Sequence, residues 1–167
     1  MIIEAHAKIN WSLNITGRRS DGYHLVDMLL QRIALHDILE ILPSEGLSLT
    51  LGPESSFTAP LDGSNLILKA AHALRERAGV DRGAAFILTK RIPSGAGLGG
   101  GSADAAAALL ALNRLWGLDL PLKELEALSP PWGRISPSAS TGKPCELRAS
   151  ARPSPPCPPC PKGIWSS

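Results

Sequence analysis

The sequence is poor in aromatic residues and cysteine and has no long apolar run. Aromatic residues make up 4% of its 167 residues, with one tyrosine at position 23. No apolar stretch approaches the roughly 20 residues of a membrane-spanning helix, and the N-terminus lacks the basic and apolar segments of a secretory signal. Lys and Arg are scattered and the net charge is +2, so no basic stripe marks a nucleic-acid site. These absences favour a cytoplasmic protein with no membrane and no nucleic-acid partner.

The three cysteines all fall after residue 144, where they do not form a recognisable site. Cys157 and Cys160 have C-x-x-C spacing, but only Cys145 adds a further thiolate and no His lies nearby. A zinc or redox site is therefore not favoured. The 44% hydrophobic and 19% charged content is typical of a soluble globular chain, and the length suits one ordinary domain.

What the chain has in excess is glycine, concentrated in one loop. Five of the seven residues from 95 to 101 are Gly, and a strongly helix-forming run follows from Asp104 to Trp116. Glycine lets the backbone approach a ligand closely, and a helix start offers unpaired N–H groups and a positive dipole end. We expect an anion site here, most naturally for phosphate, with Ser102 as N-cap and Asp104 in the first turn of the helix.

The loop does not match the two commonest phosphate-binding fingerprints. No Lys follows the glycines as a Walker A loop requires. Gly95, Gly97 and Gly100 can be aligned with G-x-G-x-x-G, but the acidic residue near the required distance, Asp119, follows a helix and not a second strand. A plain flexible linker is also disfavoured, because the loop lies between a strand-like run at 84–90 and a long helix.

Residues 3–15 alternate in polarity and predict a half-buried strand. Its apolar side carries Ala5, Ala7, Ile9, Trp11, Leu13 and Ile15, and its polar side includes Lys8 and Asn10. Taken alone, that polar side is most simply a solvated strand face. After it, Tyr23 and His24 close a turn-rich loop with two glycines. They could stack on a nucleobase and bind its edge, or plug the loop onto the core.

Further elements are expected along the chain. Residues 28–43 form one or two strands with His36 and Asp37 at a structural bend, and a hairpin turn at 43–46 leads to a strand at 47–51. A helix capped by Ser64 or Asn65 ends at Gly79, with an apolar face of Ile67, Ala71, Leu74 and Ala78. The helix after the glycine loop buries Ala105, Leu109, Leu112 and Trp116 and stops at Gly117, and Pro121 starts a short helix through Leu128.

From residue 129 to 167 the composition changes. This segment holds ten of the fifteen prolines and two of the four tryptophans, without helical or alternating periodicity. Disordered tails are usually charged and poor in Trp and Cys, whereas this segment holds two tryptophans and all three cysteines. Read one base out of frame, the stretch from Gly133 to Ser138 permits the sequence A-D-I-P-F. We therefore interpret 129–167 as an irregular tail read in a shifted frame.

The glycine-loop sequence P-S-G-A-G-L-G-G-G-S-A-D-A-A-A-A resembles the ATP-binding loop of the GHMP small-molecule kinases, which include galactokinase and the homoserine, mevalonate and phosphomevalonate kinases. The run A-K-I-N at 7–10 is similar to the N-terminal motif of that family. The run G-R-R-S-D-G-Y-H at 17–24 resembles its branch that acts on 4-diphosphocytidyl-2-C-methyl-D-erythritol. The resemblance covers residues 1 to about 128.

The resemblance implies an α+β fold, the N-terminal GHMP domain with a mixed sheet and flanking helices, similar to ribosomal S5 domain 2, and no C-terminal domain. It implies ATP-dependent phosphorylation of the substrate's 2-hydroxyl, a step of non-mevalonate isoprenoid synthesis. ATP would lie on the loop, with Mg²⁺ beside its phosphates and Ser102 as a candidate ligand. Lys8 would act on the transferring phosphoryl group, Asn10 would orient the substrate, and Tyr23 with His24 would hold the cytosine. The ATP-binding residues would be Pro93, Ser94, Gly95, Ala96, Gly97, Leu98, Gly99, Gly100, Gly101, Ser102 and Ala103.

One family motif is missing. The G-A-D segment that carries the family's catalytic base is expected just after residue 128, and it appears there only in the shifted frame. The chain as written is therefore expected to be inactive, since losing a positioned base typically costs about 10²–10⁴-fold in rate. A nucleotide-binding fragment without catalysis, another small-molecule kinase of the family and a fragment that does not fold stably remain alternatives.

Overall fold

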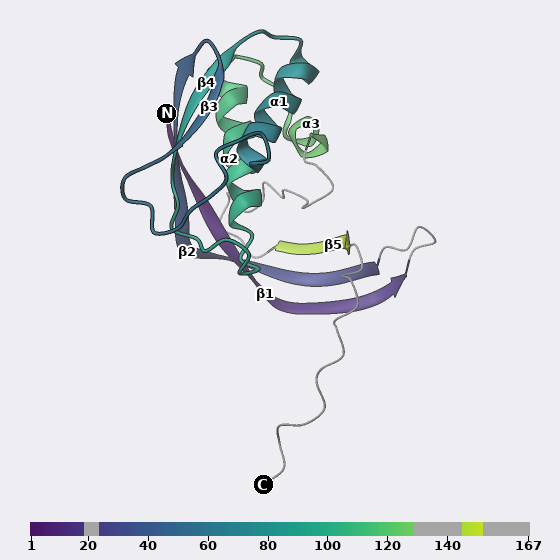
Figure 1. Ribbon diagram of the computed structural model, residues 1–167. Helices are drawn as coiled ribbons and strands as arrows, with labels where there is room; N and C mark the ends of the chain where they lie inside the picture. Colours follow the sequence, from purple (N-terminus) through teal and green to yellow (C-terminus); the bar gives the residue numbers. More distant parts are fainter. Residues whose placement is uncertain (19–23, 129–144, 152–167) are drawn as a thin grey trace.

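A computed structural model of the chain describes residues 1–18, 24–128 and 145–151. Its strands are β1 (Ile2–Arg18), β2 (His24–Ser44), β3 (Leu47–Leu51), β4 (Gly83–Thr89) and β5 (Cys145–Ala151). Its helices are α1 (Leu66–Ala78), α2 (Gly100–Leu115) and α3 (Leu122–Ala127). The predicted α+β class with a mixed sheet and flanking helices is confirmed (Figure 1). None of the described helices is long and apolar enough to cross a membrane.

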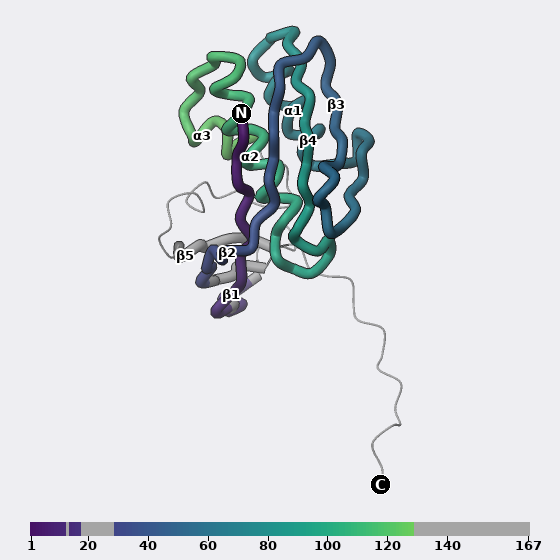
Figure 2. Tube along the Cα trace, turned by 90° about the vertical axis from the view of Figure 1, so that its left-hand side faces the viewer, coloured from purple at the N-terminus to yellow at the C-terminus, as the bar shows by residue number. Residues whose placement is uncertain are grey.

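The sheet has the order β1-β2-β4-β3, and these strands run side by side in the upper part of Figure 2. β2 is antiparallel to β1 and β4, whereas β3 is parallel to β4. The predicted hairpin at 43–46 is therefore wrong, because β4 lies between β2 and β3. A Cβ at Gly83 would lie 2.5 Å from the backbone of Glu45 and Gly46, so glycine lets β4 begin tightly against that turn.

The helices α1 and α2 cover one face of the sheet (Figure 1). The buried side chains of β4 are Ala84, Phe86 and Leu88, and they join one core with the apolar faces predicted for both helices, except that Ala78 is half-buried and lies outside this core. α1 has the predicted ends: Asn65 Oδ1 accepts from the Ile67 N–H at 2.8 Å, and Gly79 closes the helix with φ 63°. These caps satisfy backbone groups that a helix end leaves unpaired.

The long first strand is present, but its apolar side is not buried throughout. Ala5 and Ala7 are buried, whereas Trp11 is 68% exposed and Ile15 64% exposed. The register with β2 shifts after His6, Asn10 and Ile15. Such bulges bend a strand and redirect its side chains, so strict alternation predicted the strand but not its burial.

Two details of the strands near β2 also differ from expectation. His36 and Asp37 lie within one continuous strand and not at a bend between two. β5 pairs with His24–Leu30 along the same edge of β2 that β4 occupies at Ile38–Ser44. The prediction that 129–167 is irregular is thus wrong for these seven residues, because an open strand edge offers backbone partners to any extended segment. The rest of that range lies outside the described residues.

Candidate functional site

The glycine loop follows β4 and leads into α2. Gly95, Gly97 and Gly99 have positive φ values of 77°, 74° and 73°, a region that side chains with a Cβ seldom occupy. A Cβ at Gly95 or Gly97 would meet nothing within 4 Å. Glycine is thus required there by backbone conformation and not by crowding. Positive φ at alternate positions is typical of nests, in which successive N–H groups face an anion.

The start of α2 adds further donors to the loop. The N-cap is Gly99, and the N–H groups of Gly100, Gly101 and Ser102 have no acceptor within the helix. Ser102 is therefore not the N-cap, and that prediction is wrong: Gly99 takes the capping position in a left-handed conformation and places Ser102 in the first turn. Asp104 lies beyond the first turn and is buried, which also contradicts its predicted role at the helix dipole.

The structure brings Lys8 to the glycine loop, with Asn10 bonded to the Lys8 side chain. The Lys8 backbone N–H donates to the Leu98 carbonyl at 2.9 Å. The Lys8 side chain lies against Gly99, so that a Cβ there would be 3.2 Å from Lys8 Cγ and Cε. Lys8 Nζ donates to Asn10 Oδ1 at 3.2 Å, and burial lowers the pKa of Lys8. A half-buried ammonium group therefore lies at the edge of a loop suited to anions.

The predicted cytosine-binding pair is not tested in the same way. Tyr23 lies outside the described residues, and His24 begins β2 without a described side chain. Their proposed contact with a base stays a prediction.

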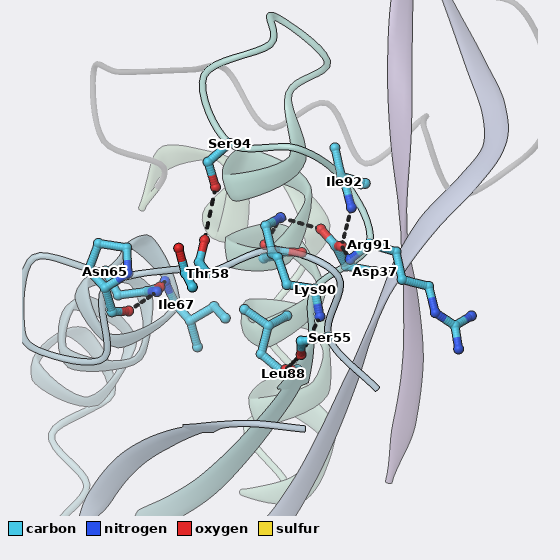
Figure 3. A network of polar contacts seen from close by, with 12 residues as sticks. Asp37, Ser55, Thr58, Asn65, Ile67, Leu88, Lys90, Arg91, Ile92 and Ser94 are labelled. Carbon is cyan, nitrogen blue, oxygen red and sulfur yellow. Dashed lines mark hydrogen bonds and ion pairs between the residues drawn. The ribbon is translucent and has the colours of Figure 1, made fainter. Parts of the chain in front are cut away.

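A buried polar network beneath the loop was missed by the sequence analysis (Figure 3). Lys90, which follows β4, pairs with Asp37 of β2 and, at 3.0 Å, with Asp104 of α2. Asp37 Oδ1 also accepts from the backbone N–H groups of Arg91 and Ile92. The network joins β2 to Lys90 at the end of β4 and to α2. Because the glycine loop runs from β4 to α2, the network holds both ends of the loop.

The charges of this network do not balance if all three groups are ionised. Burial raises the pKa of Asp104 to about 8. The Lys90 charge lowers this pKa and the Asp37 charge raises it, but burial has the largest effect. Asp104 is therefore mostly protonated at neutral pH, which leaves one ammonium and one carboxylate in the cluster. Asp104 Oδ1 is buried and has no hydrogen-bond partner among the described residues.

A signal for this network exists in the sequence. Asp37 lies in the mostly apolar run Ile33–Leu42, which also holds His36 and Glu40, and Asp104 is followed directly by Ala and Leu residues of α2. Charged residues inside apolar segments are almost never fully buried unless they are paired. The rule points to a buried pair but does not say which residues are partners.

Gly100 provides a test of how tightly α2 rests on the network. A Cβ at Gly100 would lie 2.9 Å from both Lys90 Nζ and Ile92 Cγ2. We expect Gly100→Ala to lower the free energy of unfolding by about 1–3 kcal/mol through overpacking, as measured by urea denaturation. Gly101→Ala is the matched control, because its Cβ would make only an ordinary contact with Leu66 at 3.4 Å. Equal stability of the two variants would contradict this packing.

The family model described as the GHMP kinases N terminal domain matches residues 65–144. The match continues past position 128, where the composition changes. The chain is 47% identical over 145 residues to a 4-diphosphocytidyl-2-C-methyl-D-erythritol kinase of Paramagnetospirillum magneticum, covering 87% of this chain and 50% of the relative. It is 50% identical over 127 residues to the enzyme of the same name from Chlorobium phaeobacteroides, covering 76% of this chain and 43% of the relative.

Solved structures agree with this similarity. The fold superposes on a crystal structure of 4-(cytidine 5'-diphospho)-2C-methyl-D-erythritol kinase with a TM-score of 0.72 and 38% identity, over 89% of this chain and 52% of the other. A mevalonate kinase of Methanococcus jannaschii shares the fold with a TM-score of 0.61 at 15% identity, over 93% of this chain and 56% of the other. The chain spans about half the length of the curated relatives it matches. This chain belongs to the GHMP kinase family and carries its N-terminal domain.

Proposed function

We propose that this chain supplies the ATP-binding half of a small-molecule kinase that phosphorylates the 2-hydroxyl of 4-diphosphocytidyl-2-C-methyl-D-erythritol, in the cytoplasm, for non-mevalonate isoprenoid synthesis. The observation that supports it most is the glycine loop at the start of α2 with Lys8 against Gly99. Relatives that carry this substrate in their names share 47–50% of the aligned residues.

The residues present suit a triphosphate. Gly95 and Gly97 have open space where a Cβ would lie, and the first N–H groups of α2 have no acceptor within the helix. Lys8 is placed to neutralise charge on a phosphoryl group, and Asn10 holds the Lys8 ammonium group from the same strand. In phosphoryl transfer such positioning and charge stabilisation account for most of the catalysis.

Mg²⁺ would neutralise developing charge between the phosphates of ATP. Ser102 is the candidate ligand in our proposal, since it lies half-buried in the first turn of α2. Asp104 is unsuited to that role because its carboxyl group is buried against Lys90. Tyr23 and His24 are proposed to hold the cytosine.

The nucleotide site is tested by Gly97→Val in the 167-residue chain. Gly97 has a φ of 74° and open space around a new Cβ, so valine changes the backbone of the loop without a clash. We expect ATP–Mg²⁺ to bind at least about tenfold more weakly by calorimetry, equivalent to about 1.4 kcal/mol. Gly117→Val carries similar backbone strain, with a φ of 62° and open space, but lies at the far end of α2.

The control separates strain from binding. Gly117→Val should keep the wild-type affinity for ATP. In a separate test, Tyr23→Ala should weaken the binding of cytidine 5'-diphosphate but not that of ATP, since base stacking is worth about 1–3 kcal/mol. If Gly97→Val and Gly117→Val bind ATP equally well, the loop is not the phosphate site.

We also propose that residues from about 129 onward are read in a shifted frame and that the chain as written binds ATP without transferring phosphate. The support is the position of the composition break, at which the expected G-A-D motif is absent. The coding DNA tests the idea: read one base over, it should give that motif. A stop codon before the motif would exclude the shift.

A further inference from the structure

A cluster of two histidines and one glutamate lies where β1 and β2 pair, separate from the glycine loop. Glu4 and His6 alternate along β1, and His36 is the register partner of His6 on β2. Alternate residues of a strand and direct cross-strand partners share one face of a sheet. One ligand atom from each of the three side chains lies within 4.8 Å of the other two.

A bulge in β2 sets the orientation of both imidazoles. Between the pairs His6–His36 and Lys8–Arg32, β1 advances two residues while β2 advances four. Two carbonyls of this bulge accept hydrogen bonds, that of Ile33 from His6 Nδ1 at 3.0 Å and that of Ala34 from His36 Nδ1 at 2.7 Å. A carbonyl oxygen can only accept, so the hydrogen is on Nδ1 in each ring.

When each ring is neutral, its Nε2 atom therefore presents a lone pair, and both Nε2 atoms lie beside the Glu4 carboxylate. His6 Nε2 lies 3.1 Å from Glu4 Oε2, and His36 Nε2 lies 4.0 Å from Glu4 Oε1. The two rings are 5.1 Å apart between centroids. Three acceptors that converge without a donor between them need a proton, a water molecule or a metal ion among them to satisfy their lone pairs.

We propose that Glu4, His6 and His36 form a binding site for a divalent transition-metal ion of the Zn²⁺ type. Two imidazole nitrogens and one carboxylate oxygen are a donor set that such ions prefer. Mg²⁺ prefers oxygen ligands, so the site is distinct from any Mg²⁺ on a nucleotide. The two bulge carbonyls act as the outer partners that typically hold metal-binding histidines in one tautomer.

The burial of the three side chains suits an ion that binds from solvent. The His6 and His36 side chains are 14% and 25% exposed, and that of Glu4 is 59% exposed. The rings are therefore held in place by burial and by their Nδ1 hydrogen bonds, and the exposed Glu4 carboxylate is the ligand that would adjust its position on coordination. A bound ion would join the start of β1 to the middle of β2 and leave a coordination position for water.

The test is a Zn²⁺ titration of the full chain after chelator treatment, in a background with Cys145, Cys157 and Cys160 changed to serine. These thiols are removed because they could bind zinc themselves. We expect one Zn²⁺ to bind in calorimetry and a rise in Tm. Glu4→Gln and His36→Ala should each weaken binding at least tenfold. His72→Ala is the control, because His72 is exposed on α1, and its affinity should be unchanged.

The Glu4→Gln variant should fold like the wild type, because Glu4 is exposed and glutamine has the same shape. Weaker Zn²⁺ binding by this variant therefore cannot be attributed to misfolding. If Zn²⁺ up to 100-fold molar excess gives no heat and no Tm shift, the cluster is held by protons alone and the proposal is wrong. Equal affinities in Glu4→Gln, His36→Ala and His72→Ala would place the ion elsewhere and would overturn it as well.

Discussion

Replacing Lys90 with methionine is expected to lower the free energy of unfolding by about 3–5 kcal/mol. Methionine matches much of the lysine side chain in shape but leaves the Asp37 carboxylate buried without a cation and the Asp104 carboxyl group without its donor. Both carboxyl groups are almost fully inaccessible, so neither can recover its hydration. Urea denaturation followed by circular dichroism measures the change. The ends of the glycine loop should also loosen, because Lys90 ties β2 and α2 together.

The neighbouring Arg91→Met variant is the matched control. The Arg91 side chain points away from the network (Figure 3) and pairs with the exposed Glu54 at 3.3 Å. Exposed ion pairs contribute about 0–1 kcal/mol to stability. The variant also keeps the hydrogen bond from the Arg91 backbone N–H to Asp37. If the two variants lose similar stability, the buried cluster does not hold the fold as described.

Asp104 is expected to make the domain less stable as the pH rises from about 4 to about 8. The pKa of an unfolded aspartate is about 3.9, whereas burial raises the pKa of Asp104 to about 8 in the fold. Between these values the folded state keeps a proton that the unfolded chain has released. The stabilisation is therefore fully present below the pKa of the unfolded state and is lost as the pH rises through the pKa of the folded state.

The Asp104→Asn variant should remove this pH dependence. We expect its free energy of unfolding to fall less steeply with pH than that of the wild type. The two slopes should differ by about 1 kcal/mol per pH unit between pH 4 and pH 8. Asp62→Asn is the control. Hydrogen bonds from the Ser64 hydroxyl and backbone N–H lower the pKa of the exposed Asp62, so its contribution is lost as pH falls. An unchanged slope in Asp104→Asn would show that Asp104 is ionised in the fold.

Local signals in the sequence predicted the elements well. Each of these signals depends on residues within a few positions of one another: the caps at Asn65 and Gly79, the apolar face of α1, and the junction of the glycine loop with α2. Lys8 and Asn10 were predicted to belong to the site through a motif; Lys8 contacts the loop at Gly99, and Asn10 accepts a hydrogen bond from Lys8.

Features that depend on partners far along the chain were not predictable in this way. Lys90 is 53 positions from Asp37, and only the pairing of β2 with β4 brings them together. The bulges of β1 depend on its register with β2, so the exposure of Trp11 and Ile15 cannot be derived from alternation alone. The N-cap prediction at Ser102 failed because a left-handed glycine can cap a helix without a side chain.

The strand order has a consequence for synthesis on the ribosome. Within the described sheet β3 pairs with β4, and Leu47 is aligned with Ala84, 37 residues later. At about 5–20 residues per second, β3 is made roughly 2 to 7 seconds before its neighbour exists. During that interval its backbone donors and acceptors are open to another nascent chain. Ser48 and Thr50 alternate with the leucines of β3 and are exposed in the fold. These polar residues lower the tendency of the unpaired β3 segment to associate with another chain.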